Sequence, residues 1–345
     1  MKRRLFGVIA VLVIFMLNIT SCTNNKKAEV QEKSSSTSTT NTDKVKIGFV
    51  DVTGTGEISS TLGIARDNGY IDEELSKIGV KAEFVPMTGA GPAINEALAS
   101  GSLDIGDLGD VPAIIGKAAG IDTQLISSDG LTSGASLVIP KNSTITSVKD
   151  LKGKKIATQK GAFMHEVLIN ILQSNGLTMN DIEFVNLNAQ GSADALMSGN
   201  VDGAVVGGVT LGNLVLKGYA KELVDCRKNP QWNTGGYTIA RTEFAEKNPE
   251  IIKGILKALI KAKKLCQEDN TASLKQWIKS GNSEETYKYL YPNNDYVYDV
   301  EITDKFINSG KATVEFLKKN DLIKNDVDIN KWINTSYYEA AKNAK

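Results

Sequence analysis

Short loops of glycine, threonine and other small residues follow several apolar runs in this sequence, and each precedes a helical pattern. The residues of these loops that could meet a ligand are Thr55, Gly56, Gly91, Asp110, Gly161, Ala162 and His165. Backbone N–H groups in the first turn of a helix have no helical partner, and the helix dipole makes that end partly positive. Where a corner carries little side chain, these donors approach a ligand closely, so the loops are typical of an anion-binding site.

The groups at these corners are expected to act in different ways. Backbone N–H donors are expected at Gly56, Gly91, Gly161 and Ala162. Thr55 would add a hydroxyl, whereas Asp110 is expected to organise its own corner, because a bare carboxylate repels an anion. His165, the single histidine, could contact the ligand or pack against a helix, and the sequence leaves both roles open.

Motifs for catalysis, metal ions and cofactors are not found in the chain. A metal site normally uses several His, Cys or carboxylate ligands, but the sequence has one His and three Cys. No Gly-x-Ser-x-Gly elbow or Gly-Lys-Ser/Thr phosphate loop occurs, and residues 54–56 lack the third Gly of a dinucleotide fingerprint. We therefore expect a binding protein rather than an enzyme, with no metal and no cofactor. Whether Cys226 and Cys266 pair stays open.

A phrase that occurs twice indicates the elements that position these corners. Residues 97–104, ALASGSLD, return as residues 195–202, ALMSGNVD. Both indicate a helix end, a Ser-Gly turn and a strand start, because Gly adopts the left-handed conformation that ends a helix. The upstream landmarks repeat in the same order: Asn-Gly at 68–69 and 175–176, and Glu-Phe-Val at 83–85 and 183–185. The strands at 45–50 and 155–158 that open each unit complete four matching landmarks in one order, which favour a duplicated unit over chance.

The duplicated unit predicts an α/β fold with two Rossmann-like lobes around a cleft. Alternating strands and helices at this spacing imply parallel pairing with crossover helices. We expect the first lobe at 44–131 and 236–345 and the second at 132–235, with crossings near Thr132 and Tyr237. Strands are predicted at 45–50, 83–85, 105–109, 136–140, 155–158, 183–185, 203–207 and 237–240. Tail helices, expected to cover the first lobe, are predicted at 272–280, 283–290, 303–319 and 329–341.

The N-terminal segment indicates a leader and a tether. A basic start and an apolar run at 5–17, shorter than the ~20 residues of a membrane span, predict a signal peptide at 1–21. Ile19-Thr20-Ser21-Cys22 resembles the lipobox of bacterial lipoproteins, which implies cleavage before Cys22 and lipid on its sulfur. A plain secretory signal with an incidental Cys is the alternative. Residues 22–43 are rich in Ser, Thr, Asn and Lys and predict a disordered tether, so the body would lie outside a membrane.

The charge balance argues against a nucleic-acid partner. The chain has 40 basic and 40 acidic residues, and removing the leader with Lys2, Arg3 and Arg4 leaves 37 basic residues. The mature chain is therefore slightly acidic. It shows no basic tract and no interleaving of aromatic and basic residues, which are the usual signs of nucleic-acid binding.

Several segments resemble runs found in the sulfonate-binding proteins of ABC transporters. These segments are 88–98, similar to AGPxxxEAL; 108–113, similar to TGDAPP; 148–155, similar to VxDLKGKK; 159–165, similar to QKGSSAH; and 244–250, similar to FxxxxPE. Each run alone is only moderately specific, but their order is strong. Together they span roughly residues 46–267 and agree with the duplication.

The resemblance implies the class II periplasmic-binding-protein fold of the sulfonate, taurine and nitrate group, with a helical C-terminal cover. It also implies an extracytoplasmic, lipid-anchored solute-binding protein of an ABC importer. Its expected partners are a small organic anion, foremost an aliphatic or aryl sulfonate, and the permease with its ATPase. A monomer is expected.

Two departures from the family pattern leave the exact ligand open. Ala162 and Phe163 stand where the family often has two hydroxyls, and residues 207–210, GGVT, stand where it often has Trp-Asp-Pro-Tyr. The missing Asp removes a partner for a ligand ammonium, which weakens taurine, and the missing Trp would enlarge the pocket. Nitrate, bicarbonate, a thiamine-precursor pyrimidine or another aromatic ligand are alternatives. So are a secreted enzyme and an adhesin or sensor domain on the same fold.

Overall fold

The computed structural model describes residues 42–51, 54–132, 134–229, 232, 234–293 and 299–344. These residues belong to one compact unit. The predicted signal peptide and Cys22 lie outside the described residues, as does nearly all of the predicted tether. Within the described part, no helix has both the length and the apolar character needed to cross a membrane.

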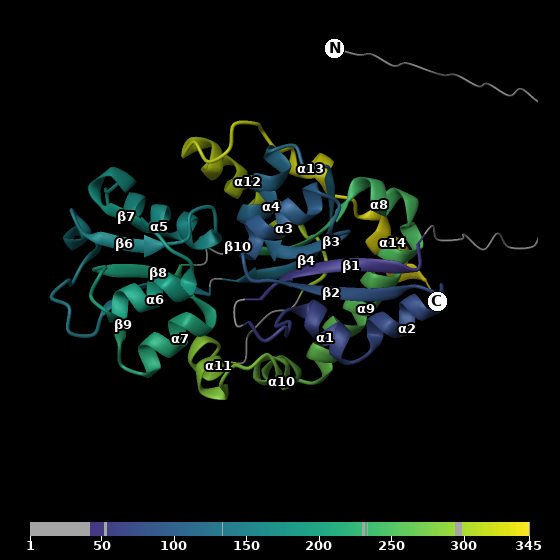
Figure 1. The fold of residues 1–345 in the computed structure, drawn as a ribbon, viewed down its shortest axis with the longest axis horizontal. Coiled ribbons are helices and arrows are strands. Elements are labelled where there is room, and N and C mark those ends of the chain that lie inside the picture. The colour runs from purple at the N-terminus through teal and green to yellow at the C-terminus, as the bar shows by residue number, and fades with distance from the viewer. Residues whose placement is uncertain are drawn as a thin grey trace, which may run out of the picture. The chain divides into compact units, whose positions relative to one another are not determined.

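The first sheet has the strand order β2-β1-β3-β10-β4 (Figure 1). Its strands are β1 (Lys44–Val50), β2 (Lys81–Met87), β3 (Ile105–Gly109), β4 (Thr123–Thr132) and β10 (Thr234–Arg241). β1 pairs in parallel with β2 and β3, whereas β10 pairs antiparallel with β3 and β4. We call this sheet and the helices packed on its two faces the first lobe.

The second sheet repeats this arrangement with the strand order β7-β6-β8-β5-β9. Its strands are β5 (Ala135–Pro140), β6 (Lys155–Thr158), β7 (Glu183–Asn186), β8 (Gly203–Gly207) and β9 (Ala220–Asp225). β6 pairs in parallel with β7 and β8, whereas β5 pairs antiparallel with β8 and β9. This sheet and its helices form the second lobe. The chain crosses between the lobes from β4 to β5 and from β9 to β10.

The repeated sequence phrase makes the same turn in both lobes. Gly101 and Gly199 have φ angles of 73° and 74°, in the left-handed region that glycine adopts without a Cβ clash. After each turn an aspartate begins the next strand. Asp104 Oδ2 accepts a hydrogen bond from Lys46 N at 2.9 Å, and Asp202 Oδ2 accepts one from Lys155 N at 2.9 Å. The duplication is therefore structural and sets the parallel register of both sheets.

Helices surround both sheets. In the first lobe they are α1 (Thr61–Asp67), α2 (Tyr70–Ser76), α3 (Ala90–Ala99), α4 (Asp110–Ala118), α8 (Thr242–Lys247), α9 (Pro249–Glu268), α12 (Asp304–Lys319), α13 (Ile329–Trp332) and α14 (Ser336–Asn343). In the second lobe they are α5 (Phe163–Ser174), α6 (Ala189–Met197), α7 (Gly208–Leu216) and the 3-10 turns η1 (Val148–Leu151), η2 (Met179–Asp181) and η3 (Cys226–Lys228). α10 (Ala272–Lys279) and α11 (Glu284–Leu290) lie in the C-terminal tail.

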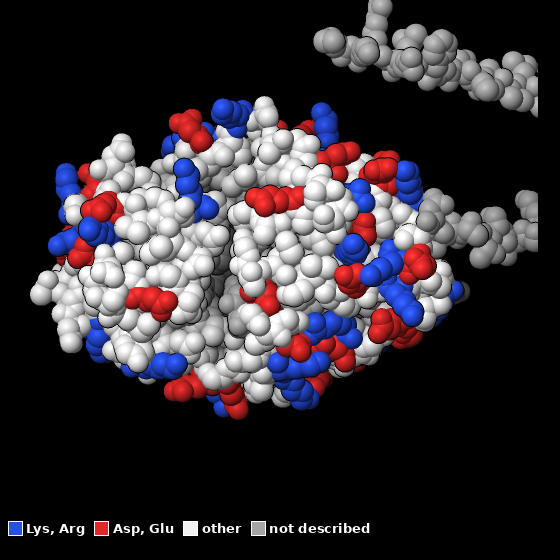
Figure 2. Space-filling view, viewed as in Figure 1, with Lys and Arg blue, Asp and Glu red and all other residues white. Residues whose placement is uncertain are grey.

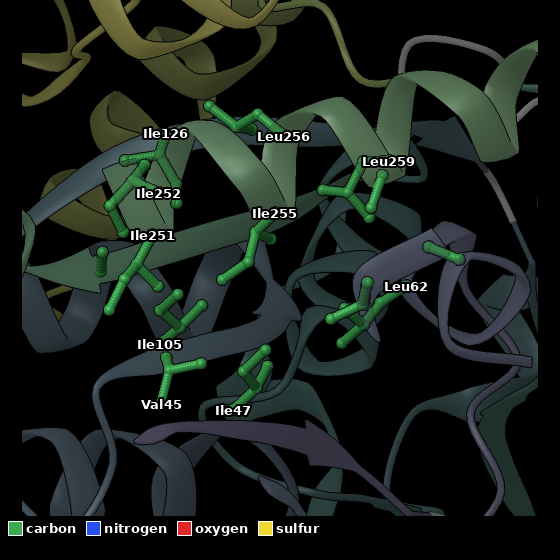
Figure 3. Close-up of a cluster of buried hydrophobic side chains, with 14 of the residues drawn as sticks. Val45, Ile47, Leu62, Ile105, Ile126, Ile251, Ile252, Ile255, Leu256 and Leu259 are labelled. Carbon is green, nitrogen blue, oxygen red and sulfur yellow. The ribbon is translucent and has the colours of Figure 1, made fainter. Parts of the chain in front are cut away.

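Helix α9 fills much of the first lobe's core (Figure 3). Its buried positions recur at helical spacing and include Ile251, Ile252, Ile255, Leu256 and Leu259. They lie in one cluster with β1 and β3 side chains that are also buried, including Val45, Ile47 and Ile105. Burying each such side chain contributes about 1.5–3 kcal/mol. This helix therefore anchors the sheet whose strand ends position the first-lobe corners.

The C-terminal tail does not cover the first lobe alone, which corrects one expectation. Trp277 of α10 and Tyr287 of α11 share an apolar cluster with Val206 and Leu214 of the second lobe. The same segment stays bonded to the first lobe, because Gln276 Nε2 donates to the Ile58 carbonyl at 2.7 Å. α10 and α11 therefore link the two lobes on one side, because Trp277 and Tyr287 pack into the apolar core of the second lobe.

The predicted helix at 329–341 is two helices in the structure, α13 and α14. Between them Ile333 forms a parallel bridge with Leu125, and Asn334 N donates to the Leu125 carbonyl at 3.0 Å. β4 is the edge strand of its sheet, so this short extended piece supplies the edge with a hydrogen-bonding partner.

Candidate ligand-binding cleft

A hollow lies on the viewed face of the molecule, between the second lobe on the left and the first lobe on the right (Figure 2). Most of the surface around it belongs to residues other than Lys, Arg, Asp and Glu. α4 follows β3 and packs against α5, which follows β6. The carboxyl ends of the parallel strands in both lobes therefore face one cleft, which is where α/β sheets bind ligands.

Three helices that begin at this edge have uncapped N-termini. Within the described residues, α3, α5 and α7 start without a side-chain cap, after Gly89, Ala162 and Gly207. They follow β2, β6 and β8, so their first-turn N–H groups lie at the carboxyl ends of parallel strands. Two of these groups already have acceptors, because Gly208 N of α7 donates to the Gly134 carbonyl at 2.9 Å and His165 N of α5 donates to the Ala162 carbonyl at 2.9 Å. First-turn N–H groups that have no such partner need an acceptor from outside the helix, and an anion satisfies them.

The N-termini of α1 and α4 are already bonded to carboxylates. Thr61 N donates to Asp129 Oδ1 at 3.0 Å, and Val111 N donates to Asp110 Oδ1 at 2.7 Å. At the α4 end a second anion would meet the negative charge of Asp110 at short range, and at the α1 end Asp129 already accepts the hydrogen bond of Thr61 N. The uncapped ends of α3, α5 and α7 are therefore the better places for an anionic ligand.

The second-lobe corner before α5 has a left-handed glycine at its centre. Gly161 has a φ angle of 78°, and its Cα faces Ile115 of α4 across the cleft, with 3.9 Å from a Cβ position to Ile115 Cδ1. Ala162 N donates to the Gln159 carbonyl at 3.3 Å. The expectation of a free donor at Ala162 therefore needs correction, because the turn itself uses that N–H group.

His165 is buried in the second lobe and is only 5% exposed. Its ring lies 5.1 Å from the Phe184 ring, which is the packing arrangement that the sequence left open. Burial first, and the nearby Lys160 charge second, lower the pKa of His165 to about 4. The imidazole is thus neutral at pH 7 and adds no positive charge for an anion.

The first-lobe corner after β1 is organised by Asp51, which the sequence analysis did not select. Its carboxylate accepts hydrogen bonds from Gly54 N at 2.8 Å and from Gly56 N at 2.9 Å. Gly56 therefore does not offer the free N–H group that was expected, because a buried carboxylate at the strand end already binds it. The Thr55 hydroxyl accepts from Glu57 N at 3.4 Å, and Thr55 is exposed.

Gly91 lies within the first turn of α3 and serves packing. A Cβ there would come within 2.4 Å of both Cβ and Cγ of Pro112 in α4. A methyl group at this distance would force the two helices apart. The glycine therefore allows α3 and α4 to approach closely at the cleft edge, and Ala90 before it has a positive φ of 56°.

Asp110 joins three elements behind the cleft. It is fully buried, and its Oδ2 accepts from Gly235 N at 3.0 Å and from Thr313 Oγ1 at 3.4 Å. These bonds tie α4 to the crossing strand β10 and to α12. Burial raises the pKa of Asp110 to about 6, so the carboxylate stays mostly ionised at neutral pH.

Two more carboxyls in the first lobe escaped sequence reasoning. Asp107 Oδ2 accepts from Ser60 Oγ at 2.6 Å, and Asp129 bonds the first residue of α1 beside it. Burial raises the pKa of Asp107 to about 6, and burial with the Asp107 charge raises that of Asp129 to about 8. Asp107 lies in the strand predicted at 105–109 but was not selected as a site residue, and Asp129 lies in a strand that was not predicted.

Metal-ligating side chains do not gather in the part of the chain that the structure describes. The described residues contain no group of three His, Cys, Asp or Glu side chains placed to hold a metal ion. Cys226 and Cys266 are both free, and burial raises the pKa of Cys226 to about 12 and that of Cys266 to about 11. Neither is therefore a thiolate at neutral pH.

Comparison with known proteins adds to this geometry. The family model described as NMT1/THI5 like matches residues 60–272. A Bacillus subtilis (strain 168) protein, provisionally named an aliphatic sulfonates-binding protein, is 30% identical over 289 residues, covering 82% of this chain and 85% of its own length. A taurine-binding periplasmic protein of Escherichia coli (strain K12) is 32% identical over 193 residues, covering 55% of this chain and 58% of its own.

Solved structures show the same fold. The crystal structure of a periplasmic aliphatic sulphonate binding protein from Escherichia coli superimposes with a TM-score of 0.69 at 26% identity, covering 86% of this chain and 93% of the other. The resemblance stated from the sequence runs is therefore confirmed. The prediction of a two-lobed periplasmic-binding-protein fold is confirmed as well.

Proposed function

Because the chain belongs to the NMT1/THI5-like family, we propose that it is the extracytoplasmic solute-binding protein of an ABC importer. It captures a small organic anion, an aliphatic or aryl sulfonate, between its two lobes and delivers it to the permease. The names of the relatives that match most of its length support this substrate class. The relatives compared above are binding proteins, which supports capture rather than catalysis.

The observation that carries the proposal is the set of three uncapped helix N-termini at the cleft. A sulfonate has three oxygens that accept hydrogen bonds and has no proton at neutral pH. The ends of α3, α5 and α7 supply backbone donors for these oxygens. Each helix end favours an anion by roughly 0.3–1 kcal/mol, and by up to ~2 kcal/mol when partly buried. Gly161 and the α5 first turn form the central cradle.

Capture proceeds by closure of the lobes. The crossings from β4 to β5 and from β9 to β10 act as the hinge, and an anion that touches both lobes favours the closed state. The three uncapped helix N-termini lie in both lobes, because α3 belongs to the first lobe and α5 and α7 belong to the second. The body acts as a monomer and carries no cofactor.

Lipid on Cys22 anchors the protein to the outer face of the cell membrane. The signal peptide at 1–21 and the tether at 22–43 support this part of the proposal from sequence alone. Residues 22–43 contain few apolar side chains that could join a core, so the tether gives the body reach toward the permease.

A melting-shift panel tests the substrate class. The full chain is heated with ethanesulfonate, benzenesulfonate, taurine, nitrate, bicarbonate or a thiamine-precursor pyrimidine. A ligand present at 100 times its Kd adds ~2.7 kcal/mol to the free energy of unfolding. That corresponds to a rise of roughly 5–10 °C in Tm for a domain of this size. Sulfonates should give the largest shifts, and a shift with only nitrate, bicarbonate or the pyrimidine would replace the sulfonate assignment.

A further inference from the structure

One face of α5 packs across the cleft against the first lobe. Phe163 lies against apolar clusters of both lobes, and Gln173 Nε2 donates to Asn320 Oδ1 of the first lobe at 3.2 Å. Glu166 is three residues after Phe163 and seven before Gln173, so helical spacing places it on the same face. The side chain of Glu166 is therefore part of the contact between the lobes.

Glu166 is buried at this contact without a charged partner. It is 8% exposed, and within the described residues its Oε2 atom has no hydrogen-bond partner. The carboxylate of Asp110, in α4 of the first lobe, acts on it electrostatically. Tyr237 of β10 is 1% exposed, and within the described residues its hydroxyl has no hydrogen-bond partner. Burial first, and then the charges of Asp110 and Glu166, raise the pKa of Tyr237 well above its ordinary value. Asp110 and Tyr237 of the first lobe and Glu166 of the second therefore bring three acidic groups to the same contact.

Among the residues that the structure describes, no cation acts on Glu166 or Asp110. α5 packs against α4, β5, β6 and β8, and β5 and β8 contain no ionisable side chains. It also contacts the end of α12 through Gln173 and Asn320, and the ionisable side chains of α12 are all exposed. Lys155 of β6 is exposed and pairs with Glu183 at 3.7 Å, while Lys117 of α4 donates to the Thr123 carbonyl at 2.8 Å. The remaining neighbours in sequence are His165, which is neutral at pH 7, and Lys160, which is exposed.

The protonation state follows from this environment. Burial first, and the Asp110 charge second, raise the pKa of Glu166 to about 9. Asp110 has a pKa of about 6, so at pH 7 to 8 Asp110 is mostly ionised and Glu166 keeps its proton. When the lobes separate and water reaches Glu166, its pKa returns toward the ordinary value of ~4.3. Closure at neutral pH therefore takes up a proton.

We propose that Glu166 is a proton-dependent latch between the lobes, whose carboxyl must be protonated for α5 to pack against α4 beside Asp110. Ionisation of Glu166 places a second negative charge at the buried contact and opens it. The contact involves only side chains of the chain itself. The latch therefore acts in the absence of any ligand, and its test is independent of the proposed sulfonate function.

Small-angle scattering of the full chain, without added ligand, tests the latch between pH 7 and pH 10. The wild-type radius of gyration should rise with a midpoint near the Glu166 pKa of about 9. Glu166→Gln keeps the shape of the side chain and cannot ionise, so its radius should stay at the pH 7 value throughout. Circular dichroism at each pH confirms that both proteins remain folded.

Glu183→Gln is the matched control, because Glu183 is an exposed carboxyl on the same lobe. It should expand like the wild type. A wild-type radius that is equal at pH 7 and pH 10 overturns the latch, whatever the variants do. Expansion of Glu166→Gln with the wild-type midpoint, or loss of expansion in Glu183→Gln, also overturns it.

Discussion

Replacing Gly161 by alanine tests whether the α5 corner is the anion cradle. Gly161 has a φ angle of 78°, and Gly199, at the opposite end of a helix in the same lobe, has a φ of 74°. Neither glycine has a neighbour that a Cβ would meet closer than 3.9 Å. The two alanine variants therefore share the same backbone strain and the same free space, and they differ in their distance from the cleft.

The expected magnitudes follow from that strain. A non-glycine residue in the left-handed region costs roughly 1–2 kcal/mol. Strain that a variant keeps in its free state lowers its stability, by at most roughly 2–8 °C in Tm for a domain of this size. In the free Gly161→Ala protein the corner relaxes away from positive φ, and binding must restore it. If restoring the positive φ angle costs about 1–2 kcal/mol, the affinity falls about 5- to 30-fold.

Isothermal titration with the sulfonate that gives the largest melting shift measures the effect. Gly161→Ala should bind about 5- to 30-fold more weakly than the wild type, while Gly199→Ala should bind within twofold of it. Equal affinities for the two variants, at equal losses of Tm, would refute the cradle. So would a Gly199→Ala protein that loses affinity while Gly161→Ala keeps it.

Three further predictions concern the anchor and the ionisable groups. Cys22→Ala should release the protein from the membrane fraction with its fold intact, and a variant that still sediments with membranes would contradict lipid anchoring. His165→Gln should leave the sulfonate affinity and its pH profile between pH 6 and 8 unchanged, because the His165 pKa of about 4 keeps the ring neutral there; a step near pH 6.5 that the variant abolishes would show a histidinium instead. Asp129 has a folded pKa of about 8, raised above its ordinary 3.8, so its contribution is fully present below pH 3.8 and is lost as the pH rises through 8. Thermal unfolding should therefore show Asp129→Asn gaining stability over the wild type from pH 6 to pH 9, and a constant difference would argue against that shift.

The sequence predicted most of the scaffold because its signals are local. A strand followed by a glycine turn and a helix depends on residues close in the chain, and the turn at Gly101 and Gly199 needs only a left-handed glycine. The parallel strands followed from the repeat of that unit. The phrase at 97–104 and its copy at 195–202 therefore indicated both sheets before any long-range contact was known.

The strands that the sequence analysis missed are antiparallel neighbours of the crossings. β4 contains Ser127, Ser128, Asp129 and Gly130 within one strand, so it shows no alternation of apolar and polar residues. Its pairing with β10 shifts register twice, which removes the period that identifies a strand. β9 is followed directly by the turn η3 and, in the described sheet, pairs with β5 alone at the edge. These strands form because a partner strand already exists, and that partner is distant in sequence.

The corners were located correctly in the chain, but the state of their donors depends on distant groups. Gly56 was expected to offer a free N–H group, yet Asp51, five residues earlier, accepts its hydrogen bond. Asp110 bonds Gly235, which is 125 residues later in the chain. A sequence shows which corners are bare, whereas only the fold shows which donors are already satisfied.

The repeat predicts a symmetric scaffold, but the site that it carries is asymmetric. Corresponding corners of the two lobes follow corresponding strands, and both α4 and α7 begin directly after one of them. In the first lobe the Asp110 carboxylate occupies that helix end, whereas in the second lobe the α7 end has no side-chain cap and Gly208 N donates to the Gly134 carbonyl at 2.9 Å. Carboxyl groups therefore bind the α1 and α4 ends of the first lobe, while the α3 end stays without a side-chain cap. We therefore expect an anion to be held chiefly by the second lobe. Closure then brings the first lobe onto a ligand already bound, and this order makes the Gly161 corner more sensitive to substitution than its first-lobe counterpart.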